Sequence, residues 1–139
     1  MSLLMLLAAC SLALTEDQRF AEQVKENVRW GLKDPDSANF ERVEAFAKEH
    51  VACGRVNAKN AYGGYTGYEN FSFYNGNAHL QSDDLKAYLI GSTRCLIIHS
   101  ERAIEDIKTD SLPQQDKKAM IDERMRFIDK LKRDATFGL

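Results

Sequence analysis

The sequence predicts an α+β fold: a small antiparallel sheet of three or four strands packed against an N-terminal helix and C-terminal helices. Phe20, Val24, Val28 and Leu32 recur at intervals of four, which is typical of one face of an amphipathic helix. Further along, aromatic residues alternate up to Asn75-Gly76, the dipeptide that most strongly indicates a β-hairpin. A second helical apolar pattern follows toward the C-terminus. Together these observations indicate a sheet and helices in one domain.

Length and composition limit the classes of protein to consider. A chain of 139 residues is long enough for one domain. With 44% hydrophobic and 29% charged residues, its composition is that of a globular protein. The formal net charge of −2 offers no electrostatic basis for binding nucleic acid. We expect one globular domain over residues 15–139, preceded by a separate apolar segment over residues 1–14.

The first helix has a clear start and end. Thr15 and Gln18 are spaced as a capping box, in which each side chain bonds the backbone of the other. Asp34-Pro35 ends the helix, because the residue before a proline is pushed out of the α region. Trp30 lies outside the apolar stripe. We expect it to pack against the N-terminal segment or a later strand, and exposure as a binding residue is the alternative.

The middle of the chain is expected to form the sheet. Phe40–Lys48 has apolar residues suited to a strand, although its glutamates and alanine also suit a helix. Val51–Lys59 would pair antiparallel with it. After a glycine loop over Ala61–Gly67, the strand Tyr68–Tyr74 turns at the hairpin dipeptide into a returning strand, Asn77–Gln81.

The segment Leu85–Lys108 has two interpretations. Ser82-Asp83-Asp84 is a cluster typical of a helix N-cap, and a helical stripe follows it. However, Gly91-Ser92-Thr93 interrupts the stripe, and Cys95–Ile98 also suits a short buried strand. The residues of the stripe are Leu85, Leu89, Leu96, Ala103 and Ile107.

A last helix is expected to begin near Pro113 and to run to about Arg133, because proline is favoured in the first turn of a helix. Its basic residues alternate with acidic ones, which predicts a solvated mixed-charge face. Its predicted apolar face consists of Met120, Ile121, Phe127, Ile128 and Leu131.

The segment Met1–Leu14 is apolar and contains Leu7-Ala8-Ala9-Cys10. Small residues before a cysteine resemble the lipobox of bacterial lipoprotein signal peptides. That resemblance implies cleavage before Cys10 and lipidation of this cysteine, with stable membrane attachment through two or three acyl chains. The uncharged Ser11 that follows is compatible with a periplasmic protein anchored to the outer membrane.

The same segment departs from a secretory signal in one respect. The start of a signal peptide carries positive charge, whereas no Lys or Arg precedes Cys10. Either the true start lies upstream, or the segment is an apolar helix that packs on the core. It is too short to cross a bilayer as a conventional transmembrane helix.

The remaining cysteines, Cys53 and Cys95, are an even pair, as in proteins of oxidising compartments. A bridge between them would contribute about 4 kcal/mol on the chain-entropy model. The alternative is two buried free thiols, which behave as small hydrophobic residues. We expect the disulfide.

No pattern of catalytic, metal-binding or cofactor-binding residues emerges. Gly63-Gly64 lacks the lysine and the helix start of a phosphate-binding loop. His50, His79 and His99 share no metal-ligand spacing, so we predict no metal and no cofactor. A catalytic Cys53 would need a free thiolate, which conflicts with the disulfide. We therefore predict a protein that is not an enzyme.

The block Cys53–Phe71 reads C-G-x-V-N-x-K-N, then G-G-Y-x-G and a closing aromatic residue. It resembles a family of small uncharacterised bacterial proteins, in which an upstream D-P-x-S-x-x-F stands where this chain has Asp34–Phe40. The resemblance implies an exported α+β domain without an established activity. The long helical part after Leu85 departs from the family pattern.

The block is also rich in glycine and tyrosine, and two interpretations of it remain open. In the structural one, two asparagines bond the loop backbone, a lysine pairs with a carboxylate, and glycines permit a tight turn. In the functional one, exposed tyrosines form a rigid recognition surface. The candidate binding residues are Asn57, Lys59, Asn60, Tyr62, Tyr65 and Tyr68.

These features lead to three functional hypotheses. The first is a non-enzymatic envelope lipoprotein that binds a protein partner, in an immunity, inhibitor or exclusion role. The second is a module that binds envelope glycan through tyrosine and asparagine side chains. The third is a thiol-dependent enzyme that uses Cys53 with His79 or Asn57.

Overall fold

The computed structural model describes residues 13–138, with side chains described to residue 135. Its α-helices are α1 (Glu16–Trp30), α2 (Leu85–Thr109) and α3 (Gln114–Gly138), and a short 3-10 turn, η1, covers Pro35–Ser37. The strands β1 (Asn39–Phe46), β2 (Val51–Asn57), β3 (Glu69–Tyr74) and β4 (Asn77–Leu80) form one antiparallel sheet in the order of the chain. The predicted α+β fold is therefore confirmed.

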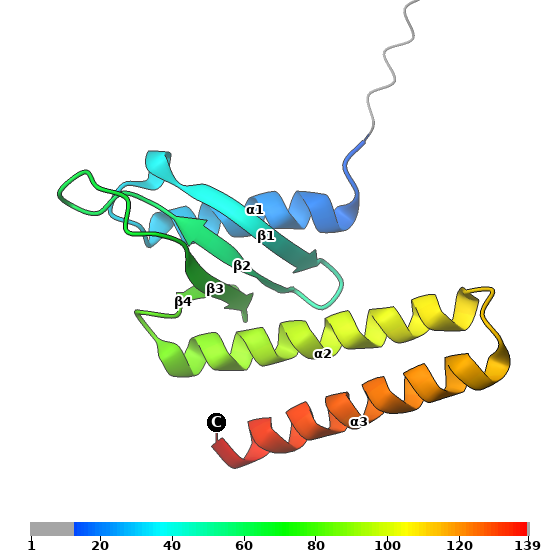
Figure 1. The fold of residues 1–139 in the computed structure, drawn as a ribbon. Coiled ribbons are helices and arrows are strands. Elements are labelled where there is room, and N and C mark those ends of the chain that lie inside the picture. Colours follow the sequence, from blue (N-terminus) through cyan, green and yellow to red (C-terminus); the bar gives the residue numbers. More distant parts are fainter. Residues whose placement is uncertain (1–12, 139) are drawn as a thin grey trace, which may run out of the picture.

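The helices lie in layers around the sheet (Figure 1). Helix α1 covers one face, α2 crosses the other, and α3 packs along α2 on the side away from the sheet. No helix among residues 13–138 is long and apolar enough to cross a membrane. The N-terminal segment with Cys10 lies outside the described residues.

Helix α1 forms as its sequence predicts. Thr15 and Gln18 make both hydrogen bonds of the capping box. The stripe of Phe20, Val24 and Val28 is buried against the sheet, where the core continues into residues such as Ala52, Val56, Phe71 and Phe73. This layer contains the larger of the two apolar clusters.

Short turns join β1 to β2 and β3 to β4, whereas a longer loop joins β2 to β3. The segment Phe40–Lys48, for which a strand and a helix were both possible, is a strand as far as Phe46. Asn75 and Gly76 both have positive φ, as a two-residue hairpin turn with the twist of the sheet requires. Between Glu41 and Glu44, β1 carries a bulge at which Arg42 has a φ of 50°. The bulge shifts the alternation of side chains in β1, so residues on either side of it that are an odd number of positions apart can face the same core.

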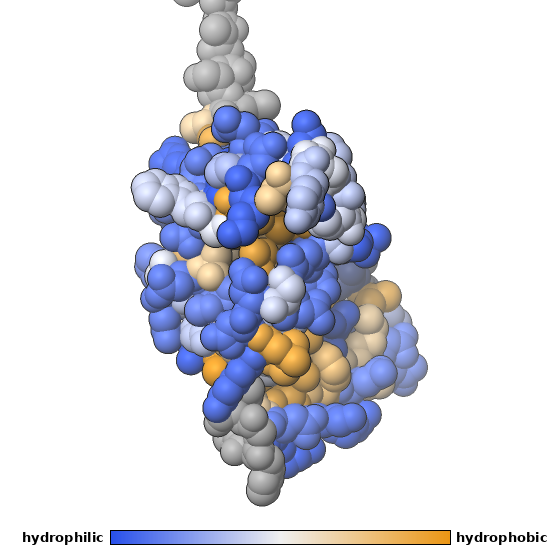
Figure 2. Space-filling view, turned by 90° about the vertical axis from the view of Figure 1, so that its left-hand side faces the viewer, coloured by the Kyte–Doolittle hydropathy of each residue, from blue (hydrophilic) through white to orange (hydrophobic). Residues whose placement is uncertain are grey.

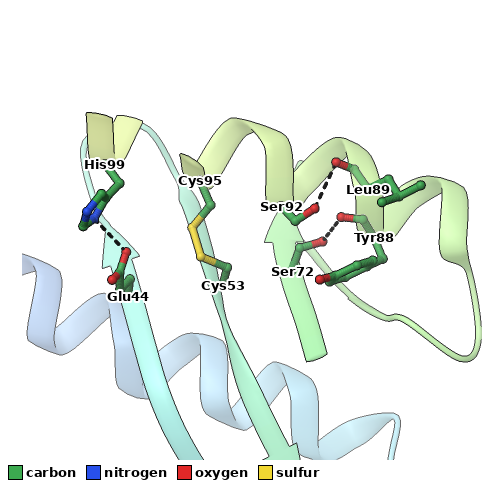
Figure 3. Close-up of a disulfide and its surroundings, with 8 residues drawn as sticks. All are labelled: Glu44, Cys53, Ser72, Tyr88, Leu89, Ser92, Cys95 and His99. Atoms are coloured by element: carbon green, nitrogen blue, oxygen red, sulfur yellow. Dashed lines mark hydrogen bonds and ion pairs between the residues drawn. A yellow bond between two sulfur atoms is a disulfide. The ribbon is translucent and has the colours of Figure 1, made fainter. Parts of the chain in front are cut away.

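Helix α2 is continuous, so the alternative strand at Cys95–Ile98 is wrong. Gly91 does not break the helix but permits its close approach to β3: a Cβ at this position would lie 2.3 Å from the Ser72 Oγ. The Ser72 hydroxyl donates a hydrogen bond to the Tyr88 carbonyl at 3.0 Å, as Figure 3 shows.

The predicted apolar stripe of α2 is wrong in its first half and correct at Ile107, which is buried. Leu85, Leu89 and Leu96 are exposed, because α2 meets the sheet through a different face that includes Gly91 and Cys95. In Figure 2, hydrophobic groups gather on the lower half of the molecule, where α2 and α3 lie. The helix is amphipathic, but its contact with the sheet uses Ile90, Cys95 and Ile98 rather than the predicted leucines.

Cys53 of β2 and Cys95 of α2 form the expected disulfide, with an S–S distance of 2.04 Å (Figure 3). The bond joins residues 42 positions apart and ties α2 to the centre of the sheet. The free-thiol alternative is therefore wrong in this structure.

Helix α3 extends beyond the predicted end at Arg133, to Gly138. Of its predicted apolar face, Ile128 is buried, whereas Met120 and Phe127 are exposed. Because α3 packs against a single helix, it has one narrow line of contact, and the flanks of its apolar face remain open to solvent.

Candidate functional site: the glycine–tyrosine loop

The loop between β2 and β3, residues 58–68, projects from one end of the sheet (Figure 1). At its tip, the Asn60 side-chain oxygen accepts hydrogen bonds from the N–H groups of Tyr62 (2.9 Å) and Gly64 (3.2 Å). The Asn60 backbone N–H donates to the Gly64 carbonyl, and the Gly63 N–H donates to the Asn60 carbonyl. One asparagine thus closes the tip in the way that an Asx turn does.

The base of the loop is closed by a second asparagine. The Asn57 side-chain oxygen accepts a hydrogen bond from the Gly67 N–H at 3.2 Å. Gly67 and Gly63 have φ values of 97° and 82°, in a region that residues with a Cβ rarely adopt. The structural interpretation of the two asparagines and of these glycines therefore agrees with the hydrogen bonds.

The loop is also held against the turn η1. The Lys59 N–H donates to the Ser37 hydroxyl at 2.8 Å, and the Tyr65 hydroxyl donates to the Ser37 carbonyl at 3.2 Å. Asn39 donates its side-chain N–H to the Tyr65 oxygen at 3.3 Å. Ser37 is a contact that sequence reasoning did not single out, although it belongs to the upstream D-P-x-S-x-x-F element.

The three tyrosines of the loop differ in how much they are exposed. Tyr62 is 97% exposed, whereas Tyr65 and Tyr68 are 51% and 40% exposed. The Lys59 ammonium lies 5.7 Å from the Tyr65 ring centre, and the Arg55 guanidinium lies 5.2 Å from that of Tyr68. Tyr62 is thus free to meet a partner, while the other two also hold the loop in shape.

The structural interpretation predicted that Lys59 pairs with a carboxylate. Among the described residues it does not. Its charged group instead lies near an aromatic ring, a contact worth about 0.5–1 kcal/mol at an exposed site. The ammonium group therefore stays accessible beside Tyr65.

A shallow cleft of about 190 Å³ opens between the loop and the C-terminal end of α1. Its lining includes Lys59 and Thr66 of the loop, Lys33 after α1 and Asp83 after β4. Trp30, three residues before Lys33, is 87% exposed, so the expectation that it packs against a later strand is wrong. The alternative partner, the N-terminal segment, lies outside the described residues except for its last two. This end of the molecule presents Trp30 as well as Tyr62 to solvent.

The described residues contain no group of three or more His, Cys, Asp or Glu side chains placed to hold a metal ion. His99 lies 3.1 Å from Glu44, and His79 stacks on Tyr74, so the histidines take part in separate contacts. Cys53 is bonded to Cys95 and has no thiolate to use as a nucleophile while the disulfide is intact.

Comparison with known proteins yields no match among protein-family models, curated proteins or solved structures. The resemblance of the block Cys53–Phe71 to small exported bacterial proteins therefore stays a prediction, as does the lipobox at Cys10.

Proposed function

We propose that this protein is a non-enzymatic lipoprotein of the bacterial envelope that binds a protein partner through the glycine–tyrosine loop. The observation that carries the proposal is that the loop is rigidly hydrogen-bonded while Tyr62 at its tip is 97% exposed. A loop that is ordered before binding loses little conformational entropy on association, which favours affinity. Tyrosine supplies a large amphipathic contact with few rotatable bonds.

The disulfide supports export, because such bonds persist in oxidising compartments such as the periplasm. Lipidation at Cys10 would hold the domain at the periplasmic face of the outer membrane. A small anchored domain of this kind acts by occlusion, which fits an immunity, inhibitor or exclusion role.

Glycan recognition is the competing hypothesis, and the hydrogen bonds weigh against it. The side-chain oxygens of Asn57 and Asn60 already accept N–H groups of the loop. An amide oxygen can accept two hydrogen bonds, so the Asn60 oxygen has no acceptor position left for a sugar hydroxyl and the Asn57 oxygen has one. An exposed tyrosine surface with few free amide acceptors is better suited to a protein.

The test is capture of a partner from envelope extract by the purified domain. We expect Tyr62→Ala to reduce the captured partner at least about 10-fold, because truncating a central aromatic contact typically costs 2 kcal/mol or more. Met125→Ala, which removes an exposed side chain on α3, is the matched control and should leave capture unchanged. Equal capture by the wild type and Tyr62→Ala would contradict the proposed surface.

Two further measurements test the glycan hypothesis and the lipid anchor separately. Sedimentation with insoluble peptidoglycan that depends on Tyr62 would favour the glycan hypothesis instead. Membrane fractionation of cells that carry Cys10→Ser tests the anchor, and unchanged membrane association would exclude lipidation at Cys10 as its cause.

A further inference from the structure

Helix α2 leaves part of its face of the sheet uncovered, and a groove of about 380 Å³ lies there. This volume is within the range of about 300–1,000 Å³ that is typical of ligand sites. Figure 3 shows the disulfide and the Glu44–His99 contact that join α2 to the strands beside the groove. The lining includes Arg42, Glu44, Arg55 and Asn70 from the strands, and Ser92 and Leu96 from α2.

Arg42 is the unusual residue of this groove, because it has a φ of 50° at the bulge of β1. The bulge itself has a structural reason: Phe40 and Val43 both pack on the core beneath α1, and regular alternation would put them on opposite faces. A glycine at position 42 would meet that need without conflict with a Cβ. Strained residues other than glycine cluster at functional sites, and bulges redirect side chains there.

The charges of the groove leave Arg42 as its available cation. Arg55 is paired with Glu41 at 2.7 Å and lies over Tyr68, while Glu44 contacts His99 at 3.1 Å. Arg42 forms no ion pair with any residue that the structure describes. A guanidinium group matches the two oxygens of a carboxylate with parallel hydrogen bonds. The Arg42 guanidinium is therefore complementary to an anion, while Glu44 elsewhere in the lining restricts that anion to the Arg42 end of the groove.

The remaining lining narrows the class of ligand. Leu96 is 48% exposed and supplies apolar surface, while Asn70 and Ser92 add polar groups along the groove. Apolar surface with a few placed polar groups is typical of a ligand site, and the C-terminal residue of a polypeptide offers a carboxylate and an apolar side chain to match it. Because Arg55 at the groove stacks on Tyr68 of the loop, the groove adjoins the surface proposed above.

We propose that this groove binds the C-terminal residue of a protein partner, with the terminal carboxylate on Arg42 and an apolar side chain against Leu96. The proposal rests on the proposed function in treating the partner as a protein, and it adds the chemistry that the partner must present. The groove can be tested with peptides alone, independently of the loop.

The experiment is an NMR titration of the intact domain with acetyl-Ala-Ala-Leu and with its C-terminal amide. We expect the free acid to shift the backbone signals of Gly54, Arg55 and Leu96. The amide should bind at least 10-fold more weakly, because it lacks the charge that pairs with Arg42. Arg42→Gln should weaken binding of the acid by a similar factor.

A matched pair of variants separates the side chain of Arg42 from its backbone. Arg42→Gly removes the guanidinium but suits a positive φ, so it should raise the urea midpoint of unfolding and abolish peptide binding. Asn75→Gly changes another residue of positive φ, at the β3–β4 turn, and should leave binding unchanged. Loss of binding in a more stable Arg42→Gly variant cannot be attributed to misfolding.

Several results would overturn the proposal: no binding of the acid, equal binding of acid and amide, or undiminished binding to Arg42→Gln. Tighter binding of decanoate than of the peptide at the same residues would assign the groove to an acyl chain instead. If Tyr62→Ala retains its partner while the peptide results hold, the loop proposal fails and the groove proposal stands.

Discussion

The two faces of the sheet are covered by helices that pack in different ways. Helix α1 contributes large apolar side chains, Phe20, Val24 and Val28, which meet the aromatic residues of β3. Helix α2 approaches the opposite face through Gly91 and Cys95 and is tied by a disulfide. The comparison shows that an apolar stripe identifies the buried face of a helix only where large side chains make the contact.

The energetic consequence is that the two helices depend on different interactions. Full burial of a Val or Phe side chain contributes about 1.5–3 kcal/mol. Several such buried side chains therefore stabilise the packing of α1 on the sheet. In the contact of α2 with the sheet, Cys95 is buried but Ile90 and Ile98 are only partly buried, so less apolar surface per side chain is removed from water. The attachment of α2, and of α3 through it, therefore relies more on the covalent bond.

The largest expected effect is that of removing this bond. The double variant Cys53→Ala, Cys95→Ala should lower the free energy of unfolding by about 4 kcal/mol, the chain-entropy value for a loop of this size. Hydrogen exchange should accelerate first in α2 and α3, while amides of β2 and β3 stay better protected. Urea unfolding monitored by circular dichroism, together with exchange mass spectrometry, measures both.

The wild type in reductant provides the control, since it should unfold at nearly the midpoint of the double variant. An equal rise in exchange across α1 and α2 would contradict the difference between the two faces. Val24→Ala gives the complementary change: it should accelerate exchange in α1, because it removes part of the apolar contact of this helix with the sheet.

The same contrast explains how far the sequence could predict the structure. The capping box, the stripe of α1 and the Asn75-Gly76 turn are local signals whose physical cause lies within a few residues, and all three predictions were confirmed. The exposed stripe of α2 was misassigned because Leu85, Leu89 and Leu96 form a helical pattern whichever face meets the sheet. In the sequence, Gly91 suggested that the helix is interrupted. Its actual role, the close approach of α2 to Ser72, depends on a residue of another element and has no local signal.

In the candidate site, too, some features could be predicted from the local sequence and others could not. Asn57 and Asn60 were expected to bond the loop backbone, and they do so. Asn60 bonds its near neighbours, as asparagine does in turns, whereas Asn57 bonds Gly67 across the base of the loop. The contact of the loop with Ser37 joins segments about twenty residues apart, and the position of Arg42 at a bulge depends on strand register. Neither has a local signal in the sequence.

An intermediate effect is expected at Gly91. In Gly91→Ala, the new Cβ would lie 2.3 Å from the Ser72 Oγ and 2.8 Å from the Tyr74 ring, so α2 must shift away from β3. Overpacking of this kind costs about 1–3 kcal/mol, which exceeds the gain of about 1 kcal/mol from replacing a helical glycine. The urea midpoint should therefore fall.

A double-mutant cycle with Ser72→Gly tests the cause. Removing the Ser72 side chain relieves the contact, so Gly91→Ala should destabilise the Ser72→Gly protein less than it destabilises the wild type. Additive effects of the two changes would show that Gly91 is not required for this approach.

The smallest expected effect concerns Asp17, which links the two helices directly. Its carboxylate accepts a hydrogen bond from Arg102 of α2 at 2.6 Å and another from the Ala47 N–H at 2.8 Å. The bond from Arg102 first, and then that from Ala47, lower the pKa of Asp17 below its ordinary value. The folded state therefore gains stability above the unfolded pKa of about 4, and loses it as the pH falls through the lower folded pKa.

Asp17→Asn should accordingly destabilise the protein at pH 7 and have little effect at the acid end of the folded range. The difference at pH 7 should be at most about 0.5 kcal/mol, because the Asp17 and Arg102 side chains are 37% and 43% exposed and water screens the pair. Urea midpoints at pH 7 and pH 3 measure it, with Glu22→Gln on α1 as a control that leaves α2 untouched. A loss of equal size at both pH values would mean that the Asp17 charge does not stabilise the junction, and that α1 and α2 are coupled only through the sheet between them.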